Sequence, residues 1–273
     1  MIADYKRAFT GIAAVLAALW MTDAGANEVS TFDCVIQPTE FVELSSPVPG
    51  IIDTIAVDRS DPVEKGQEVA ELKSDVEQAQ VDLSKQRAGF DSEIESKRAS
   101  LSFAKRSQGR TQKLFNKKAV PFHVLDEAKT EAILAATELR TAEQNKRMAE
   151  LELARAEATL ALRTVRSPIS GVVVERLKAP GEFIDDKPIL RIAQLDPLRV
   201  EVIVPVGKFG TIKNGMRAEV TPELARKRKY IAQVIIVDKV VDAASGTFGV
   251  RLELPNPGNY IPGGLRCSLT FLD

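Results

Sequence analysis

The chain has 273 residues, of which 37 are basic and 38 acidic, so its formal net charge is −1. This balance gives no electrostatic reason to expect nucleic acid or an anionic membrane surface as a partner. Aromatic residues make up only 5% of the chain, a share more typical of an elongated, coiled-coil-rich protein than of a large globular core.

Residues 1–26 have the pattern of a secretory signal peptide. Lys6 and Arg7 give a basic start, and an apolar stretch of about 14 residues ends at Met21. This stretch is shorter than the roughly 20 residues of a membrane-spanning helix. We therefore expect cleavage before Asn27 and an exported protein, with an uncleaved inner-membrane anchor as the alternative.

Two cysteines follow, Cys34 and Cys267, one near each end of the expected mature chain. Neither has a second Cys or a His at metal-ligand spacing. A pair of cysteines in an exported protein can oxidise, and the ends of a domain often meet on one surface. The sequence thus suggests a disulfide between them, with two buried thiols on neighbouring strands as the alternative.

A short sequence occurs twice, as SPVPGII at residues 46–52 and as SPISGVV at residues 167–173. Each position of the second copy lies 121 residues after its counterpart, and the same offset aligns Val63 with Ile184. Two matching halves are expected to pack together. The segment between them must therefore leave and return to the same place.

Strand patterns broken by turns cover residues 46–72 and 164–195. The turns of the two copies contain Gly50, Gly66, Gly171 and Gly181. Residues 31–44 are expected to form one or two short strands, and residues 198–271 a run of alternating strands. Strands at this spacing predict a small β-barrel, which residues 31–44 complete so that Cys34 comes near Cys267.

Between the two copies lies a segment rich in Ala, Glu, Lys and Arg. Helices are expected from Ser74 to about Phe115 and from about His123 to Leu162. The second has a 3-4-3-4 apolar seam that only Lys146 interrupts. The seam residues are Leu125, Ala128, Ala132, Ala135, Leu139, Ala142, Ala149, Leu153, Ala156 and Leu160. The rougher seam expected on the first helix consists of Val76, Ala79, Leu83, Phe90, Ile94, Leu101 and Ala104.

The two helices are expected to form an antiparallel hairpin, because its ends must return to the packed halves. Each arm of about 40 residues spans roughly 60 Å. The tip is expected at residues 116–122, where Pro121 prevents the helix from continuing.

In order and spacing these motifs resemble the periplasmic adaptor proteins, or membrane fusion proteins, of bacterial tripartite efflux and type I secretion systems (HlyD-like). The resemblance rests on SPVPGIIDTIAVDRSDPVEKGQEVAEL (46–72), TVRSPISGVVVERLKAPGEFIDDKPILRIAQLDPLRVEVIVP (164–205) and PGNYIPGGLRCSLTF (257–271). It implies a homo-oligomeric protein in the periplasm, associated with the inner membrane. Its implied partners are an inner-membrane transporter of RND or ABC type and a TolC-like outer-membrane channel.

The fold class that the resemblance implies is mixed α and β and elongated. It comprises a split lipoyl-like β-sandwich, a long antiparallel α-helical coiled-coil hairpin that interrupts it, and a small β-barrel. The expected parts are a signal peptide (1–26), a barrel (27–45 with 197–273), a lipoyl-like domain (46–73 with 163–196) and the hairpin (74–162).

In pump adaptors of this family the hairpin tip carries an Arg, a Leu four residues later and a Ser seven residues beyond that. Here Arg110 and Leu114 match, but Pro121 occupies the Ser position. The candidate channel-docking residues are Arg110, Leu114, Phe115, Val120, Pro121 and Phe122. Alternatively, Arg110 is a solvated surface charge and Leu114 a seam residue.

Many family members continue past the barrel into a membrane-proximal domain. The sequence ends at Asp273, so this domain is expected to be absent or reduced, and the transporter to dock on the barrel and lipoyl-like domains.

Neither catalysis nor a cofactor is expected. The single His, His123, lies at the expected tip, and the sequence offers no metal cluster, phosphate loop or nucleophile–base set. Lys73 lies near the position at which lipoyl and biotinyl carriers attach their cofactor, but a rod replaces the tight turn that carriers have. The alternative function is a free-standing periplasmic scaffold or binding protein of the same fold.

Overall fold

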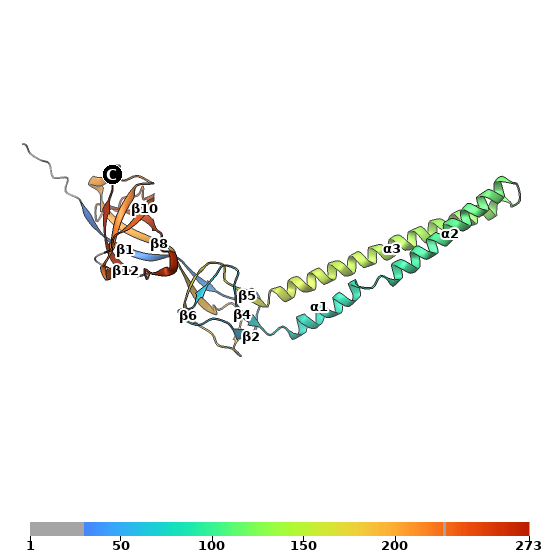
Figure 1. Ribbon diagram of the computed structural model, residues 1–273, viewed down its shortest axis with the longest axis horizontal. Helices are drawn as coiled ribbons and strands as arrows, with labels where there is room; N and C mark the ends of the chain where they lie inside the picture. Colours follow the sequence, from blue (N-terminus) through green and yellow to red (C-terminus); the bar gives the residue numbers. More distant parts are fainter. Residues whose placement is uncertain (1–29, 226–227, 273) are drawn as a thin grey trace, which may run out of the picture.

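The computed structural model describes residues 30–225 and 228–272. The signal peptide expected at residues 1–26 lies outside the described residues. The molecule is elongated: the strands gather at one end and a helical rod projects from them (Figure 1). In the described part of the chain, no helix is both long enough and apolar enough to span a membrane.

Six strands form a closed antiparallel barrel. Their order is β1-β12-β9-β10-β11-β8, and an additional pairing of β1 with β8 closes the ring. The strands are β1 (Thr31–Leu44), β8 (Leu190–Pro205), β9 (Arg217–Pro222), β10 (Tyr230–Val237), β11 (Thr247–Leu254) and β12 (Leu265–Phe271). Short 3-10 helices lie at Val206–Lys208, Glu223–Ala225 and Pro257–Asn259. Alternate residues of β8, among them Val200, Val202 and Val204, are buried in the barrel core, as expected for strands with one face inward.

Cys34 on β1 and Cys267 on β12 are directly paired across the two strands. They form a disulfide and are both buried. The bond joins the first and last strands of the barrel.

A second, smaller group of strands lies between the barrel and the rod (Figure 1). It consists of β2 (Gly50–Ile55), β3 (Pro62–Val63), β4 (Glu68–Leu72), β5 (Thr164–Arg166), β6 (Gly171–Arg176) and β7 (Phe183–Ile184). Strands β5, β4, β2 and β7 form one sheet, whereas β6 and β3 extend the large sheet from β8. The side chains between them form a separate apolar core that includes Ile52, Leu72, Val173 and Ile184. We call this part the sandwich.

Strands β1 and β8 run through both the barrel and the sandwich. Residues 31–36 of β1 pair with β12, whereas the end of the strand at Leu44 is buried in the sandwich core. The register of β1 against β8 shifts between Pro38 and Glu40. The boundary expected after residue 45 lies beyond the end of β1, whereas the last residue of that strand, Leu44, already belongs to the sandwich core.

The rod consists of α1 (Asp75–Ala88), α2 (Ser92–Asn116) and α3 (Phe122–Ala161). Helix α3 lies alongside both α1 and α2 (Figure 1). The expectation of a continuous helix from Ser74 to Phe115 is wrong, because the arm is broken at residues 89–91. Gly89 ends α1, and glycine is a weak helix former because it loses the most backbone entropy.

The predicted seam of α3 faces its neighbours, since every residue of it is buried or half-buried, Lys146 included. On the other arm Ile94, Leu101 and Ala104 are also covered. The prediction fails on the first part of that arm: Val76 is 78% exposed, Leu83 47% and Phe90 67%, and Ala79 is exposed as well. The break at residues 89–91 rotates α1 relative to α2 and turns these side chains outward.

Candidate functional site

The far end of the rod is a tight connection between α2 and α3 at residues 117–121. The amide of Ala119 donates to the carbonyl of Leu114 over 2.9 Å, and that of Lys118 to Phe115 over 2.8 Å. These bonds satisfy carbonyls at the end of α2. Pro121 precedes α3 with an extended backbone (ψ 163°), in a position where its missing N–H costs no helical hydrogen bond.

Apolar side chains gather at this tip. The rings of Phe115 and Phe122 meet edge to face with centroids 6.1 Å apart. Leu114 is 45% exposed and Phe122 62% exposed. Exposed apolar side chains that cluster at one place are typical of sites that another protein covers.

Five of the six predicted tip residues are brought together by this connection: Leu114, Phe115, Val120, Pro121 and Phe122. Arg110 is exposed one turn lower on α2. Leu114 is not a seam residue; the half-buried Thr111 and Phe115 continue the seam of α2 instead. Leu114 is therefore available for contact with another molecule.

Basic residues surround the apolar tip. Residues 105–129 contain seven basic and two acidic side chains; the basic ones are Lys105, Arg106, Arg110, Lys113, Lys117, Lys118 and Lys129. Within this stretch, all of which the structure describes, none of the seven takes part in a salt bridge. The tip thus combines an apolar centre with a cationic rim.

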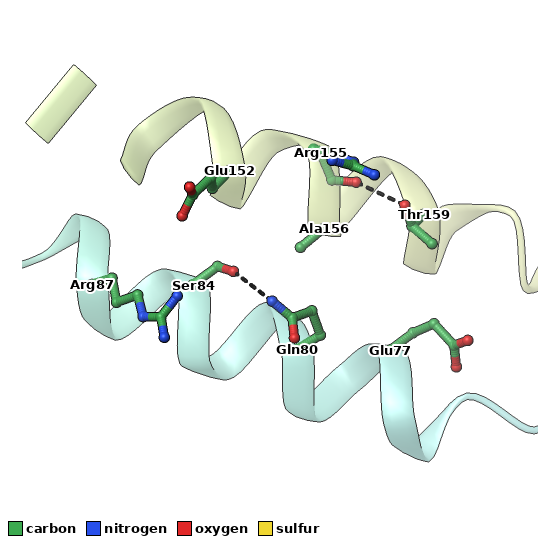
Figure 2. A pocket seen from close by; sticks show the side chains of 8 residues that line it. All are labelled: Glu77, Gln80, Ser84, Arg87, Glu152, Arg155, Ala156 and Thr159. Atoms are coloured by element: carbon green, nitrogen blue, oxygen red, sulfur yellow. Dashed lines mark hydrogen bonds between the residues drawn. The ribbon is translucent and has the colours of Figure 1, made fainter. Parts of the chain in front are cut away.

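At the other end of the rod, α1 and α3 diverge and leave a hollow of about 410 Å³ between them. Figure 2 shows Ala156 of α3 pointing across it toward Gln80 and Ser84 of α1. Gln80 Nε2 donates to Ser84 Oγ over 3.3 Å. The remaining lining residues are Glu77, Arg87, Glu152, Arg155 and Thr159. Seven of these eight lining residues are polar or charged, so the side chains around the hollow make little apolar contact between α1 and α3.

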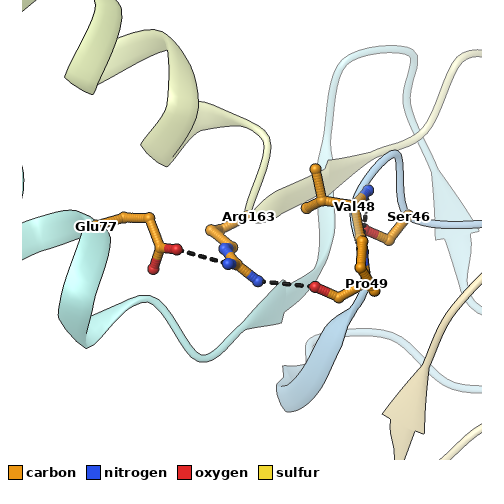
Figure 3. A network of polar contacts seen from close by, with 5 residues as sticks. All are labelled: Ser46, Val48, Pro49, Glu77 and Arg163. Carbon is orange, nitrogen blue, oxygen red and sulfur yellow. Dashed lines mark hydrogen bonds and ion pairs between the residues drawn. The ribbon is translucent and has the colours of Figure 1, made fainter.

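A clamp that the sequence did not predict connects the rod to the sandwich (Figure 3). Arg163, just after α3, contacts Glu77 Oε1 of α1 through Nη2 at 2.5 Å. Its Nη1 donates to the carbonyl of Pro49 over 3.0 Å. Hydrogen bonding of the Glu77 carboxylate to its own backbone amide, and then to Arg163, lowers the pKa of Glu77. Glu77 and Arg163 are 86 residues apart in the sequence, so no local pattern indicates that they pair.

Each of the four predicted turn glycines has a structural reason. A Cβ on Gly50 would lie 2.8 Å from Nη1 of Arg163, and one on Gly171 would lie 2.1 Å from the carbonyl oxygen of Ala193. Gly66 and Gly181 have φ of +86° and +87°, values that favour glycine. These glycines shape the sandwich and place the base of the rod.

Within residues 30–225 and 228–272, no group of His, Cys, Asp and Glu side chains is arranged to hold a metal ion. Lys73 is exposed and lies between β4 and α1, with its amide bonded to the carbonyl of Ile51 over 2.9 Å. His123 is exposed in the first turn of α3.

Comparison with protein families gives a match to the CzcB-like, barrel-sandwich hybrid domain over residues 40–194. This range covers the sandwich and the whole rod, and it accounts for more than half of the chain.

Among individual proteins, the pyoverdine export membrane fusion protein PvdR of Pseudomonas aeruginosa is 26% identical over 204 residues, covering 73% of this chain and 52% of PvdR. The chain thus spans about half the length of this curated relative. The crystal structure of MacA from Actinobacillus actinomycetemcomitans superposes with a TM-score of 0.72 at 21% identity, over 89% of this chain and 78% of MacA. The membrane fusion protein Spr0693 from Streptococcus pneumoniae gives a TM-score of 0.59 at 15% identity, over 89% of this chain and 99% of Spr0693.

Proposed function

Because the chain belongs to the CzcB-like barrel-sandwich hybrid family of membrane fusion proteins, we propose that it is a periplasmic adaptor of an efflux or secretion system. In this role it links an inner-membrane transporter, of RND or ABC type, to a TolC-like outer-membrane channel. We do not infer that this chain exports the same substrate as PvdR, because the match covers only 52% of PvdR.

The observation that carries the proposal is an exposed apolar tip at the end of a long rod. Helix α3 has 40 residues, which corresponds to roughly 60 Å at 1.5 Å per residue. A partner that covers Leu114 and Phe122 is thus held far from whatever binds the barrel. This separation suits a bridge between two membranes, and the cationic rim suits a partner surface with acidic groups.

The barrel and the sandwich are the proposed transporter-facing part. The rod is proposed to pack beside the rods of other copies in a homo-oligomer. Ile133 is 66% exposed, Met148 58% and Leu151 60% on α3, and neighbouring rods provide a way to cover such side chains.

In-cell cross-linking tests the proposal. A photoreactive residue is placed at Leu114 or Phe122 of the full chain, and adducts are identified by mass spectrometry. The matched control position is Tyr260, which is 86% exposed and lies at the barrel. We expect an outer-membrane channel in the adducts from the tip but not in those from Tyr260.

Adducts from the tip to this chain or to soluble periplasmic proteins alone would contradict the bridge. They would favour the free-standing scaffold, for which the Pro at position 121 is the supporting observation.

A further inference from the structure

Three large apolar residues on the first arm repeat with a spacing of seven: Val76, Leu83 and Phe90. Two heptads after Phe90 the same position is occupied by Ala104 of α2, which is 2% exposed and faces α3. In sequence, then, one heptad phase runs along the whole arm, with Lys97 as its polar member between Phe90 and Ala104. In the structure only α2 follows it. We call Val76, Leu83 and Phe90 the outer stripe.

The residues of α1 that face α3 lie one position later in the heptad. Glu77 and Ala88 are half-buried, while Val81 is 8% and Ser84 2% exposed. A shift of one residue corresponds to a rotation of about 100° around the helix axis. The break at residues 89–91 absorbs this rotation.

The observed phase packs poorly. Beside the buried Val81 it places Glu77 and Ser84 toward α3, and it leaves the hollow of about 410 Å³ between the helices (Figure 2). The phase of α2, one residue earlier, would place Val76 and Leu83 against the Ala and Leu seam of α3, would bring Gln80 inward and would turn Val81 outward. This exchange buries two large apolar side chains for one that is exposed, and it removes a hydroxyl and a carboxylate from the interface.

One ion pair holds α1 directly in the observed phase, and a second fixes the end of the break that leads into α2. Glu77 pairs with Arg163 at the base of the rod. Asp91, the last residue of the break, pairs with Lys146 of α3, the one polar residue in the apolar seam. Partly exposed ion pairs are individually weak, so they are suited to hold a segment that can be released.

We propose that α1 is a rotating segment with two registers on α3. We call the register seen here latched: both ion pairs are formed, and the outer stripe is exposed to solvent or to a neighbouring protein. In the released register α1 turns by about 100°, the break closes into a continuous helix, and the outer stripe packs on the seam of α3. The ion pairs thereby control whether the base of the rod presents an apolar face.

Cysteine labelling distinguishes the two registers. Leu83→Cys and Ser84→Cys are made singly in the full chain, where the Cys34–Cys267 disulfide leaves no native thiol to react. Rates of maleimide labelling are compared with the latches intact and with both removed by Glu77→Gln and Asp91→Asn. Two matched controls on α2 do not change register: Phe103→Cys, at a site 55% exposed, and Ala104→Cys, at a site 2% exposed.

With the latches intact, we expect Leu83→Cys to label as fast as Phe103→Cys and Ser84→Cys to be protected. Removal of both latches should reverse the order, with a change of at least about tenfold at each position and no change at the controls. Unchanged protection of Ser84→Cys would overturn the proposal, and so would rapid labelling at both positions, which would indicate an unfolded α1. Protection of Leu83→Cys that depends on protein concentration, with Ser84→Cys still protected, would assign the outer stripe to a neighbouring copy instead. None of these outcomes depends on a channel, so they are independent of the proposed bridge.

Discussion

Ile52 and Val173, 121 residues apart in the chain, make the same two main-chain hydrogen bonds in opposite halves of the sandwich. The amide of Ile52 donates to the carbonyl of Glu182 over 3.0 Å, and its carbonyl accepts from Gly181 over 2.8 Å.

Val173 makes the equivalent bonds to Asp61 and Ser60, again of 3.0 and 2.8 Å. Each half therefore closes a turn of the other, and neither is complete alone. The rod leaves from β4 and returns through β5, which pairs with β4. The two ends of the rod are thus fixed side by side by a sandwich that depends on both copies of the repeat.

The close approach of β6 and β8 at Gly171 predicts a position that does not tolerate a side chain. A Cβ at this residue would lie 2.1 Å from the carbonyl oxygen of Ala193, so the backbone must move to accept it. We expect Gly171→Ala to lower the free energy of unfolding by about 2–3 kcal/mol, measured by urea denaturation.

Gly109→Ala is the matched control, since the structure has nothing within 4 Å of the added Cβ and the residue lies inside α2. We expect it to raise stability by about 0.5–1 kcal/mol. Equal effects of the two substitutions would contradict the packing seen at Gly171.

The Cys34–Cys267 disulfide closes a loop with a sequence separation of 233 residues. Loss of this bond should cost about 2–5 kcal/mol, because the unfolded chain gains conformational freedom. We expect a reducing agent to lower the Tm of the wild-type protein and to leave the Cys34→Ala/Cys267→Ala variant unchanged. A wild-type Tm that is insensitive to the reducing agent would show that the bond contributes nothing to the barrel.

Much of the sandwich and of α3 was predictable because the signals are local. Ser46 and Ser167 begin the two copies of the repeat, and each donates its Oγ to the carbonyl two residues later over 2.6 Å. Such turns need only a few adjacent residues. The seam of α3 has one heptad phase over its whole length, so its buried face follows from periodicity alone.

The register of α1 and the clamp were not predictable in this way. The heptad phase of Leu83 continues past Gly89 into α2, and only the three-dimensional break shows that α1 does not follow it. The clamp was not predictable because the rod carries many carboxylates, and nothing in the sequence indicates which of them pairs with Arg163. On β1 the boundary between barrel and sandwich was also hidden, because this strand passes from one core to the other without ending.

A substitution at Leu125 measures how much the apolar seam of α3 contributes to stability near the tip of the rod. Its side chain is 2% exposed in the first turn of α3, whereas that of Ile133 on the same helix is 66% exposed. We expect Leu125→Ala to lower the free energy of unfolding by about 2–4 kcal/mol, and Ile133→Ala to change it by less than about 0.5 kcal/mol. Thermal unfolding followed by circular dichroism at 222 nm measures both, and a larger effect at Ile133 would mean that α3 presents a different face to α2.

The clamp predicts a pH dependence of stability. The pKa of Glu77 is lowered from its ordinary value of 4.5 by the backbone hydrogen bond and by Arg163. A carboxylate with a lower pKa in the folded state stabilises the fold fully above its unfolded pKa, and this contribution disappears as the pH falls through the folded pKa. We therefore expect Glu77→Gln to cost about 1 kcal/mol at pH 7 and progressively less below pH 4.5.

Glu150→Gln, at an exposed position of α3, is the control and should show no such convergence with the wild-type protein. Urea unfolding at a series of pH values measures the difference. If the cost of Glu77→Gln were the same at pH 3 and pH 7, the contact with Arg163 would not depend on the ionised carboxylate, and the clamp would hold the rod through shape alone.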